Sequence, residues 1–330
     1  MSAAPFAPTG CAVTVVEAHG PILAKRWHAD GTCEGYGKAR IVTLHQRPVA
    51  DLAALAELVR RLVTVPRCCI VRGEPIDPAR LSRVRRLKDP DLETGEAPTL
   101  REVPRRWIAL DVDSVPVPAG TDLHDLAACA RAVLPRLPFA FREATALVQA
   151  TAGHTLKPGV RLRLWYWLSR AVGEAELKQW FTGCPVDLSI FQTNQPIYTA
   201  APLFHGMADP LADRLAMLPG ARPVALVPSP SLLRPVVRVV PISARARSGD
   251  GGGRRFDALA RTVRNAAEGT RHGALFWAAC RAGEMVAEGE IDAATAAADL
   301  ARAAMEGGGK DRKNAEATAR DGIKRGQGGA

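Results

Sequence analysis

The stretch "RRWIALDVDSVPVP", residues 105–118, predicts a long buried strand that ends in two carboxylates. Successive side chains of a strand point to opposite faces of its sheet. Odd-numbered and even-numbered residues therefore separate into two sets: Trp107, Ala109, Asp111 and Asp113 on one face, and Ile108, Leu110 and Val112 on the other. The pattern predicts that Asp111 and Asp113 project together from the end of this strand.

Segments with strand and helix periodicity alternate on both sides of this stretch. We expect strands at 11–16, 39–44, 67–73, 144–151 and 160–168, and helices at 50–63, 121–137 and 173–183. The stretch "VDLSIFQTNQPIYTA" (186–200) is expected to form a further strand, with Val186, Leu188 and Ile190 packed and Asp187 facing the other way. This interleaving predicts an α+β fold with a mixed α/β core.

The composition changes near "ISARARSGDGGGRR" (242–255), where glycine, serine and arginine predict a flexible linker. Four alanine-rich stretches with helical character follow, at 255–268, 273–289, 292–307 and 312–326. We therefore expect three parts, a catalytic domain at 1–242, a linker at 243–254 and a small helical bundle at 255–330. The segment "LFWAAC" (275–280) with Met285 and Val286 is expected to form the core of the bundle.

The chain is strongly basic, with a formal charge of +10 and a pI near 9.6. Clustered cations favour a polyanionic partner, because they release counterions from a phosphate backbone. No apolar run approaches the roughly 20 residues that cross a bilayer, so no membrane role is expected. The seven cysteines form no C-x-x-C pair. Their odd number favours a reducing compartment, and we expect a cytoplasmic protein.

Two carboxylates held this close repel each other unless a cation lies between them. Oxygen ligands of this kind favour Mg²⁺ or Mn²⁺, and such pairs hold the metals of phosphoryl transfer. Asp187 is the candidate for a third carboxylate, so Asp111, Asp113 and Asp187 are the predicted catalytic and metal-binding residues. The alternative is a solvated strand end with two surface aspartates.

A hairpin-like unit, "ATAGHTLKPGVRLRLWYWLSR" (150–170), lies between the acidic segments. Its His154, Lys157, Arg161 and Arg163 are candidates for donors to a triphosphate. Arg72 and Lys25 are weaker candidates for phosphate contacts, with surface ion pairs as the alternative.

The order of these motifs resembles that of the archaeo-eukaryotic primase superfamily, in particular the primase-polymerases of phages, plasmids and integrative elements. "IALDVD" is similar to the acidic pair of the family's first motif, "TAGH" to its Ser-x-His motif, and "VDLS" to its third motif. "QPIYTAAPLFHGMADPLADR" is similar to the segment that follows. "LAKRWHADG", "CCIVRGEP" and "GTRHGALFWAACRAGEMVAEGEI" with "ATARDGIKRG" extend the likeness over most of the chain. In the second motif two residues, instead of one, separate Thr151 from His154, so Arg161 or Arg163 is an alternative for the phosphate-binding role.

The resemblance implies a catalytic core with an RRM-like sheet, followed by a helical domain. It also implies templated primer synthesis by two-metal nucleotidyl transfer, with DNA polymerase activity as an extension. The expected partners are a single-stranded DNA template, NTPs or dNTPs, and a replicative helicase encoded elsewhere, since no G-x-x-x-x-G-K-[S/T] loop occurs. Gln195 and Tyr198 are candidates for the sugar pocket, with packing as the alternative for Tyr198.

Two other functions are compatible with the same residues. One is a non-catalytic protein that binds single-stranded DNA or a replication origin, and the other is a metal-dependent nuclease. In the helical domain a basic cluster predicts backbone contacts with single-stranded nucleic acid. Its members are Lys310, Arg312, Lys313, Arg320, Lys324 and Arg325.

Overall fold

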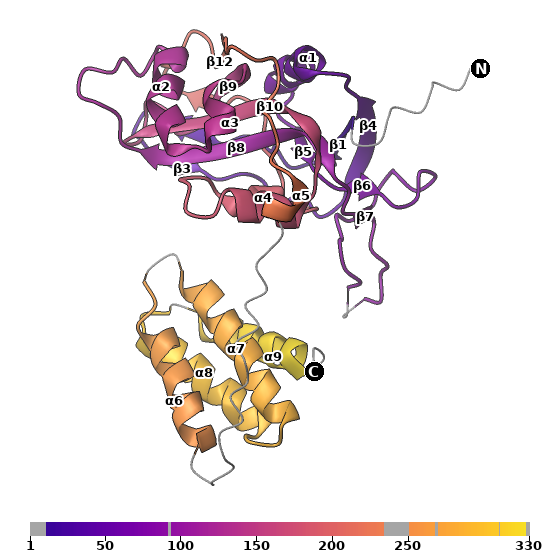
Figure 1. Cartoon of the computed structure of the whole chain (residues 1–330), viewed down its shortest axis with the longest axis vertical. Coiled ribbons are helices and arrows are strands. Elements are labelled where there is room, and N and C mark those ends of the chain that lie inside the picture. The colour runs from indigo at the N-terminus through magenta and orange to yellow at the C-terminus, as the bar shows by residue number, and fades with distance from the viewer. Residues whose placement is uncertain (1–10, 92–93, 234–250, 268–269, 310, 328–330) are drawn as a thin grey trace. The chain divides into compact units, whose positions relative to one another are not determined.

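The computed structural model describes residues 11–91, 94–233, 251–267, 270–309 and 311–327. The chain divides into two compact units, Met1–Val237 and Arg238–Ala330 (Figure 1). The larger unit combines helices with mainly antiparallel sheets, and the smaller is helical, so the predicted α+β class is confirmed. Most of the predicted linker, 243–250, lies outside the described residues, and helix α6 begins at Gly251.

A four-stranded antiparallel sheet in the order β12-β9-β10-β8 positions the carboxylate pair. Its strands are β8 (Arg105–Val115), β9 (Ala146–Ala150), β10 (Val160–Val172) and β12 (Leu215–Leu218). Strand β8 pairs with β10, and in that register Asp111 lies opposite Arg163. The strands predicted around residues 105–118, 144–151 and 160–168 are thus confirmed, whereas a specific likeness to an RRM sheet stays a prediction.

A second sheet, in the order β4-β1-β5, is formed by the N-terminal part of the chain. Its elements are β1 (Ala12–Ala18), β4 (Val42–Pro48) and β5 (Cys68–Val71), with helix α1 (Leu52–Val63) between β4 and β5. Asp51 caps α1, because its side chain accepts the N–H of Ala54 at 2.8 Å. Two smaller sheets consist of β2 (Arg26–His28), β3 (Cys33–Glu34) and β11 (Leu203–His205), and of β6 (Glu74–Pro75) and β7 (Leu100–Arg101).

Both faces of β8 and β10 are covered, which explains their continuous apolar character. On one face Trp107 lies 6.3 Å from Trp165, centroid to centroid, and donates its indole N–H to the carbonyl of Ala12 at 3.0 Å. On the other face Tyr166 meets the edge of Phe141 at 5.0 Å. Helices α2 and α3 lie over this sheet (Figure 1). The predicted alternation of the two faces is therefore confirmed.

The remaining elements of the larger unit are short. They are α2 (Leu126–Val133), the 3-10 helix η1 (Leu134–Arg136), α3 (Phe139–Arg142), α4 (Glu174–Trp180), the 3-10 helix η2 (Leu188–Phe191) and α5 (Pro230–Leu233). Helices predicted at 121–137 and 173–183 are confirmed by α2 with η1 and by α4.

The strand expected from Val186 onward is wrong, because η2 begins directly after Asp187. The side chain of Asp187 accepts the backbone N–H and the hydroxyl of Ser189, each at 2.9 Å. Such local bonds from aspartate to the backbone two residues on compete with strand pairing and start a turn. Val186 and Ile190 are buried as expected, while Leu188 is half-buried and Asp187 is exposed.

The smaller unit contains α6 (Gly251–Arg264), α7 (Arg271–Ala287), α8 (Ala293–Glu306) and α9 (Arg312–Gln327), which confirms the four predicted helices. Helices α7 and α9 pack backbone to backbone. A Cβ atom built on Gly326 would lie 2.0 Å from the carbonyl oxygen of Cys280, and one on Gly322 would lie 2.5 Å from the Cβ of Ala279. Only glycine fits at such a crossing, so these residues set how closely the two helices approach.

The core of the smaller unit differs from expectation most at Trp277, while Phe276, Cys280 and Val286 are half-buried. Leu275, Ala278, Ala279 and Met285 are buried, but Trp277 in the same predicted core segment is 50% exposed. Helical geometry places Trp277 on the side of α7 that faces away from these residues. No described helix of the chain is long and apolar enough to span a membrane.

Candidate functional site

The predicted carboxylate pair stands where strand β8 leaves the core. Leu110 and Val112 are fully buried, whereas the side chain of Asp111 is 28% exposed and that of Asp113 is 66% exposed. Both aspartates line the same cavity. The structure therefore brings the two carboxylates together at the surface end of β8.

Each aspartate of the pair is bound to an arginine of the neighbouring strand β10. Arg163 donates from Nη2 to Oδ2 of Asp111 at 2.9 Å. Arg161 donates from Nη1 to Oδ1 of Asp113 and from Nη2 to the hydroxyl of Ser114. Two buried or half-buried positive charges thus neutralise the like-charge repulsion that two carboxylates would otherwise suffer.

These arginines keep unused hydrogen-bonding capacity. Arg163 is only 5% exposed, and besides Asp111 it donates from Nη1 to the carbonyl of Tyr198. The Nε atoms of Arg161 and Arg163 are both buried, and neither has an acceptor among the described residues. A buried donor without an acceptor costs free energy, about 1–3 kcal/mol, so the two arginines are not fully satisfied by the partners that they have here.

Asp187 is the third predicted carboxylate, and its backbone joins the open edge of β8. Its N–H donates to the carbonyl of Asp111 at 3.0 Å. Its carboxylate accepts two hydrogen bonds from Ser189. Among the described residues that line the cavity with Asp111 and Asp113, Asp187 is not included. Within the described ranges no three acidic, histidine or cysteine side chains are arranged to hold a metal ion.

A cavity of about 290 Å³ opens in front of the carboxylate pair. Besides these aspartates and arginines, it is lined by Lys25, Tyr36, Thr151, Ala152, Gly153, Lys157, Gln195, Pro196 and Tyr198. The cavity therefore combines two carboxylates with four cations, a composition suited to a ligand that carries several negative charges.

Both lysines of this cavity lie over aromatic rings. The ammonium of Lys25 lies 5.1 Å from the ring centroid of Tyr36, and that of Lys157 lies 5.7 Å from Trp27. Tyr36 in turn stacks on Tyr198, with centroids 3.6 Å apart and planes 5° from parallel. Burial raises the pKa of Tyr36 to about 12, so this ring stays neutral at physiological pH.

His154 has a different role from the predicted one. It is fully buried, its Nε2–H donates to the carbonyl of Leu123 at 2.8 Å, and its Nδ1 accepts the N–H of Arg161 at 3.2 Å. Burial lowers the pKa of its imidazole below the ordinary value of 6.5. Both ring nitrogens are therefore used to hold the β9–β10 connection, and neither is available to a phosphate in this structure.

The neutral state of His154 predicts a pH effect on stability. Below about pH 6.5 the unfolded chain binds a proton at this residue that the folded chain does not bind, so the free energy of unfolding falls as the pH falls. Urea unfolding measured at about pH 7.5 and about pH 5.5 should show a smaller loss for His154→Gln than for the wild type. Equal losses in the two proteins would contradict the buried neutral imidazole.

Arg72 also differs from the prediction of a phosphate contact. It is 4% exposed and donates to the carbonyls of Trp107 at 2.9 Å and Val172 at 3.0 Å. Its guanidinium lies 5.2 Å from the ring centroid of Trp107, and burial lowers its pKa to about 9. Because it is enclosed by strands β8 and β10 and does not line the cavity, Arg72 is a structural residue.

Tyr36 and Ser114 belong to this site but were not predicted from the sequence. The available signal for Tyr36 was an aromatic residue between two glycines, in "EGYGK" (34–38), since binding residues are found disproportionately on loops. Ser114 directly follows the carboxylate pair and has a positive φ of 59°, which turns the chain at the end of β8. No sequence pattern would have indicated its contact with Arg161.

Comparisons with known proteins give one relationship. The chain is 29% identical over 177 residues to a protein of Escherichia phage T5 named "Putative replication origin binding protein". The match covers 48% of this chain and 18% of the phage protein, so the chain spans less than a fifth of that relative. No protein-family model matches the chain, and no solved structure matches it. The chain is thus similar to a phage replication protein, while membership of the primase superfamily stays a prediction.

Proposed function

We propose that the larger unit is a nucleotidyltransferase of the primase-polymerase type, which synthesises primers on single-stranded DNA for the replication of a mobile genetic element. The observation that carries the proposal is the pairing of Asp111 with Arg163 and of Asp113 with Arg161 at the wall of a cavity that also holds Lys25 and Lys157. Carboxylates beside cations in one cavity are what a nucleotide bound with its metal ions requires.

The ion pairs explain how such a site is stable without its ligand. When a nucleoside triphosphate binds with divalent cations, Arg161 and Arg163 can exchange their carboxylate partners for phosphate oxygens of the same charge. The released carboxylates can then hold the cations. Each charged group keeps a partner of opposite sign throughout, so the exchange avoids leaving a buried charge alone.

The donor set fits Mg²⁺ or Mn²⁺ in its chemistry, because both ions prefer carboxylate oxygens. Asp111 and Asp113 would hold the ions, and Asp187 would join them if its carboxylate turned away from Ser189. When bound, such ions lower the pKa of an attacking 3'-hydroxyl and neutralise the leaving pyrophosphate.

The other residues of the cavity would position the nucleotide. Lys25 and Lys157 approach from two separate loops and would contact the outer phosphates, while the guanidinium groups of Arg161 and Arg163 would donate to an inner one. Gln195 and Tyr198 border the same space and would contact the sugar of an NTP or dNTP. A replicative helicase is the expected partner, and the cytoplasm would be the site of action.

A second candidate is a protein that binds single-stranded DNA or a replication origin without catalysis. The similarity to the phage T5 protein, whose name describes origin binding, favours it. In that case the ion pairs between β8 and β10 would be permanent, and the basic surface alone would contact DNA.

One assay separates these functions. The protein is incubated with single-stranded DNA, labelled NTPs or dNTPs and Mg²⁺ or Mn²⁺, and the products are resolved by size. Labelled oligonucleotides that depend on both template and metal are the expected result. Binding of DNA without any product would overturn the catalytic proposal in favour of origin binding, and degradation of the template would indicate a metal-dependent nuclease instead.

A further inference from the structure

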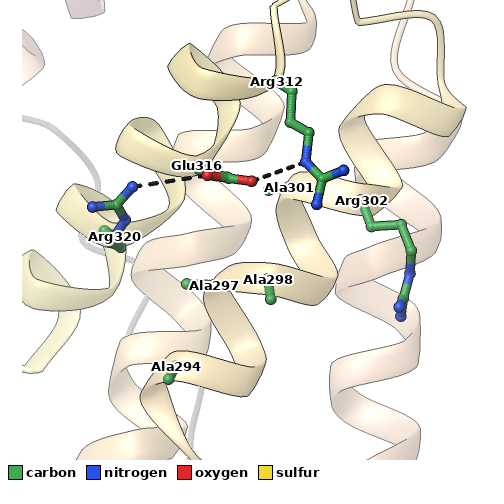
Figure 2. Close-up of a pocket in the computed structure, with 8 residues that line it drawn as sticks. All are labelled: Ala294, Ala297, Ala298, Ala301, Arg302, Arg312, Glu316 and Arg320. Carbon is green, nitrogen blue, oxygen red and sulfur yellow. Dashed lines mark hydrogen bonds and ion pairs between the residues drawn. The ribbon is translucent and has the colours of Figure 1, made fainter.

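The smaller unit has a groove of about 340 Å³ between α8 and α9, with an alanine floor and arginines at its border. Figure 2 shows Arg312 and Arg320 directed toward Glu316 between them, at 2.9 Å and 4.0 Å. These two members of the predicted basic cluster are thus already paired with an anion, and Lys310 lies outside the described residues. The groove indicates no particular ligand.

In the larger unit, a row of polar side chains crosses the four-stranded sheet. Gln149 of β9 lies opposite Arg163 of β10, and Arg163 lies opposite Asp111 of β8. Residues directly opposite each other on neighbouring strands share one face of the sheet. Gln149 is 4% exposed, and the other residues of β9 are buried and apolar. Because a buried amide costs free energy unless it is hydrogen-bonded, the partners of Gln149 indicate its role.

The amide of Gln149 joins two partners that fix its orientation. Its Oε1 accepts the indole N–H of Trp165 at 3.1 Å, and its Nε2 donates to the carbonyl of Thr199 at 2.7 Å. An indole N–H can only donate and a backbone carbonyl can only accept, so one orientation of the amide satisfies both. The bond with Trp165 therefore holds the amide N–H of Gln149 toward Thr199.

Residues 195–199, here called the cavity wall, border the cavity of the carboxylate pair without forming a helix or a longer strand. Ile197 forms an isolated bridge with Ile70 of β5, through backbone bonds of 2.7 Å and 3.0 Å. The next two carbonyls of the wall accept from the side chains of Arg163 and Gln149. The position of the wall therefore depends on these two side chains of the sheet.

The two side chains differ in what the proposed reaction requires of them. Arg163 also bonds Asp111, and in the proposed function it exchanges this carboxylate for a phosphate. A guanidinium that turns toward a phosphate no longer holds the carbonyl of Tyr198 in the same geometry. Gln149 is uncharged and does not line the cavity. Its bond with Thr199 can therefore persist while a nucleotide binds.

We propose that Gln149 is a positioning residue for the nucleotide, which holds the cavity wall through the carbonyl of Thr199 and so keeps Gln195 and Tyr198 at the sugar. The inference rests on the proposed function, since it requires a nucleotide in this cavity. The cations that would contact the phosphates come from other segments of the chain. Loss of the amide should therefore weaken the contact with the sugar and leave the contacts with the phosphates intact.

The test is isothermal titration calorimetry of the full-length protein with Mg²⁺ and without template, using dATP, ATP and inorganic triphosphate as separate ligands. Gln149→Met keeps an unbranched side chain and removes both hydrogen bonds. It should weaken binding of the preferred nucleotide about fivefold, the size of effect expected for one lost hydrogen bond, and leave triphosphate binding unchanged. In primer synthesis it should raise KM for the nucleotide and change kcat by less than about twofold.

The matched control is Gln46→Met, the same replacement on β4. Gln46 is half-buried and donates to the hydroxyl of Thr14 at 2.6 Å, away from the cavity, so both ligands should bind as in the wild type. Gln149→Asn has an amide that is one methylene shorter, so it should lose part of the affinity for the nucleotide. It carries the test if Gln149→Met does not fold by circular dichroism.

Two results with folded variants of Gln149 would overturn the proposal. One is wild-type affinity for the nucleotide. The other is an equal loss of affinity for nucleotide and triphosphate, because Gln149 would then support the site as a whole. If the wild type binds neither ligand, the proposed function fails together with this inference. If the wild type binds nucleotide and Gln149→Met binds it less tightly, but no primer is made, the catalytic proposal alone fails.

Discussion

Replacing both carboxylates of the pair, Asp111→Asn with Asp113→Asn, is expected to reduce primer synthesis by at least about a hundredfold, which corresponds to ~2.7 kcal/mol of activation free energy. Asparagine keeps the shape of each side chain and still accepts a hydrogen bond from Arg163 or Arg161. It removes the negative charges that would hold divalent cations next to the transferred phosphoryl group. The measurement is the initial rate of labelled oligonucleotide formation at saturating nucleotide.

A loss of charge elsewhere should not have this effect. Asp122→Asn removes one exposed carboxylate whose side chain is 67% accessible, and it lies outside the cavity, so its rate should match the wild type. Circular dichroism and thermal melting of the double variant should show a folded protein. If the folded double variant still makes primers at the wild-type rate, Asp111 and Asp113 are not catalytic, and their pairing with arginines is structural.

Replacing Arg72 by alanine is expected to lower the free energy of unfolding of the larger unit by about 3 kcal/mol or more. The change removes the donors to two buried carbonyls, those of Trp107 and Val172, and leaves a void beside the indole of Trp107. A buried polar group left without its partner costs ~1–3 kcal/mol, and the void adds to this cost. Urea unfolding, followed by circular dichroism, measures the loss.

Arg101→Ala is the matched control for this prediction. Arg101 is 60% exposed and pairs with Glu74 at the surface, where an ion pair contributes ~1 kcal/mol or less. If Arg72→Ala does not fold, Arg72→Lys provides the comparison, since it keeps the positive charge but loses the forked geometry and should be intermediate in stability. A variant of Arg72 with wild-type stability and a raised KM for nucleotide would instead restore the interpretation as a phosphate contact.

Local periodicity predicted much of the architecture. The alternation in residues 105–118 and 160–168 placed Asp111 and Asp113 on one face and Arg161 and Arg163 on one face, as the structure has them. Alternation is a property of consecutive residues in a strand. It therefore does not depend on which other strand pairs with it. The four alanine-rich helices could be predicted for the same reason, because the helical repeat is also a property of nearby residues.

Local pattern failed where a side chain redirects the backbone. After Val186 the apolar spacing suited a strand, but the bonds of Asp187 with Ser189 start a 3-10 helix instead. The stretch "LFWAAC" is a different case, because the helical repeat itself places Trp277 opposite the buried face of Leu275, Ala278 and Ala279. The prediction there relied on composition instead of helical spacing.

The sequence by itself determined the candidate residues of this protein: the acidic pair at the end of an apolar strand, the cations of the next hairpin, and the order in which they follow each other. Only the tertiary structure decided their partners. Arg163 meets Asp111 across 52 positions of chain because of the register between β8 and β10, and the same folding encloses Arg72 and His154 away from the cavity. Register and burial depend on contacts between distant segments, and no local pattern contains them.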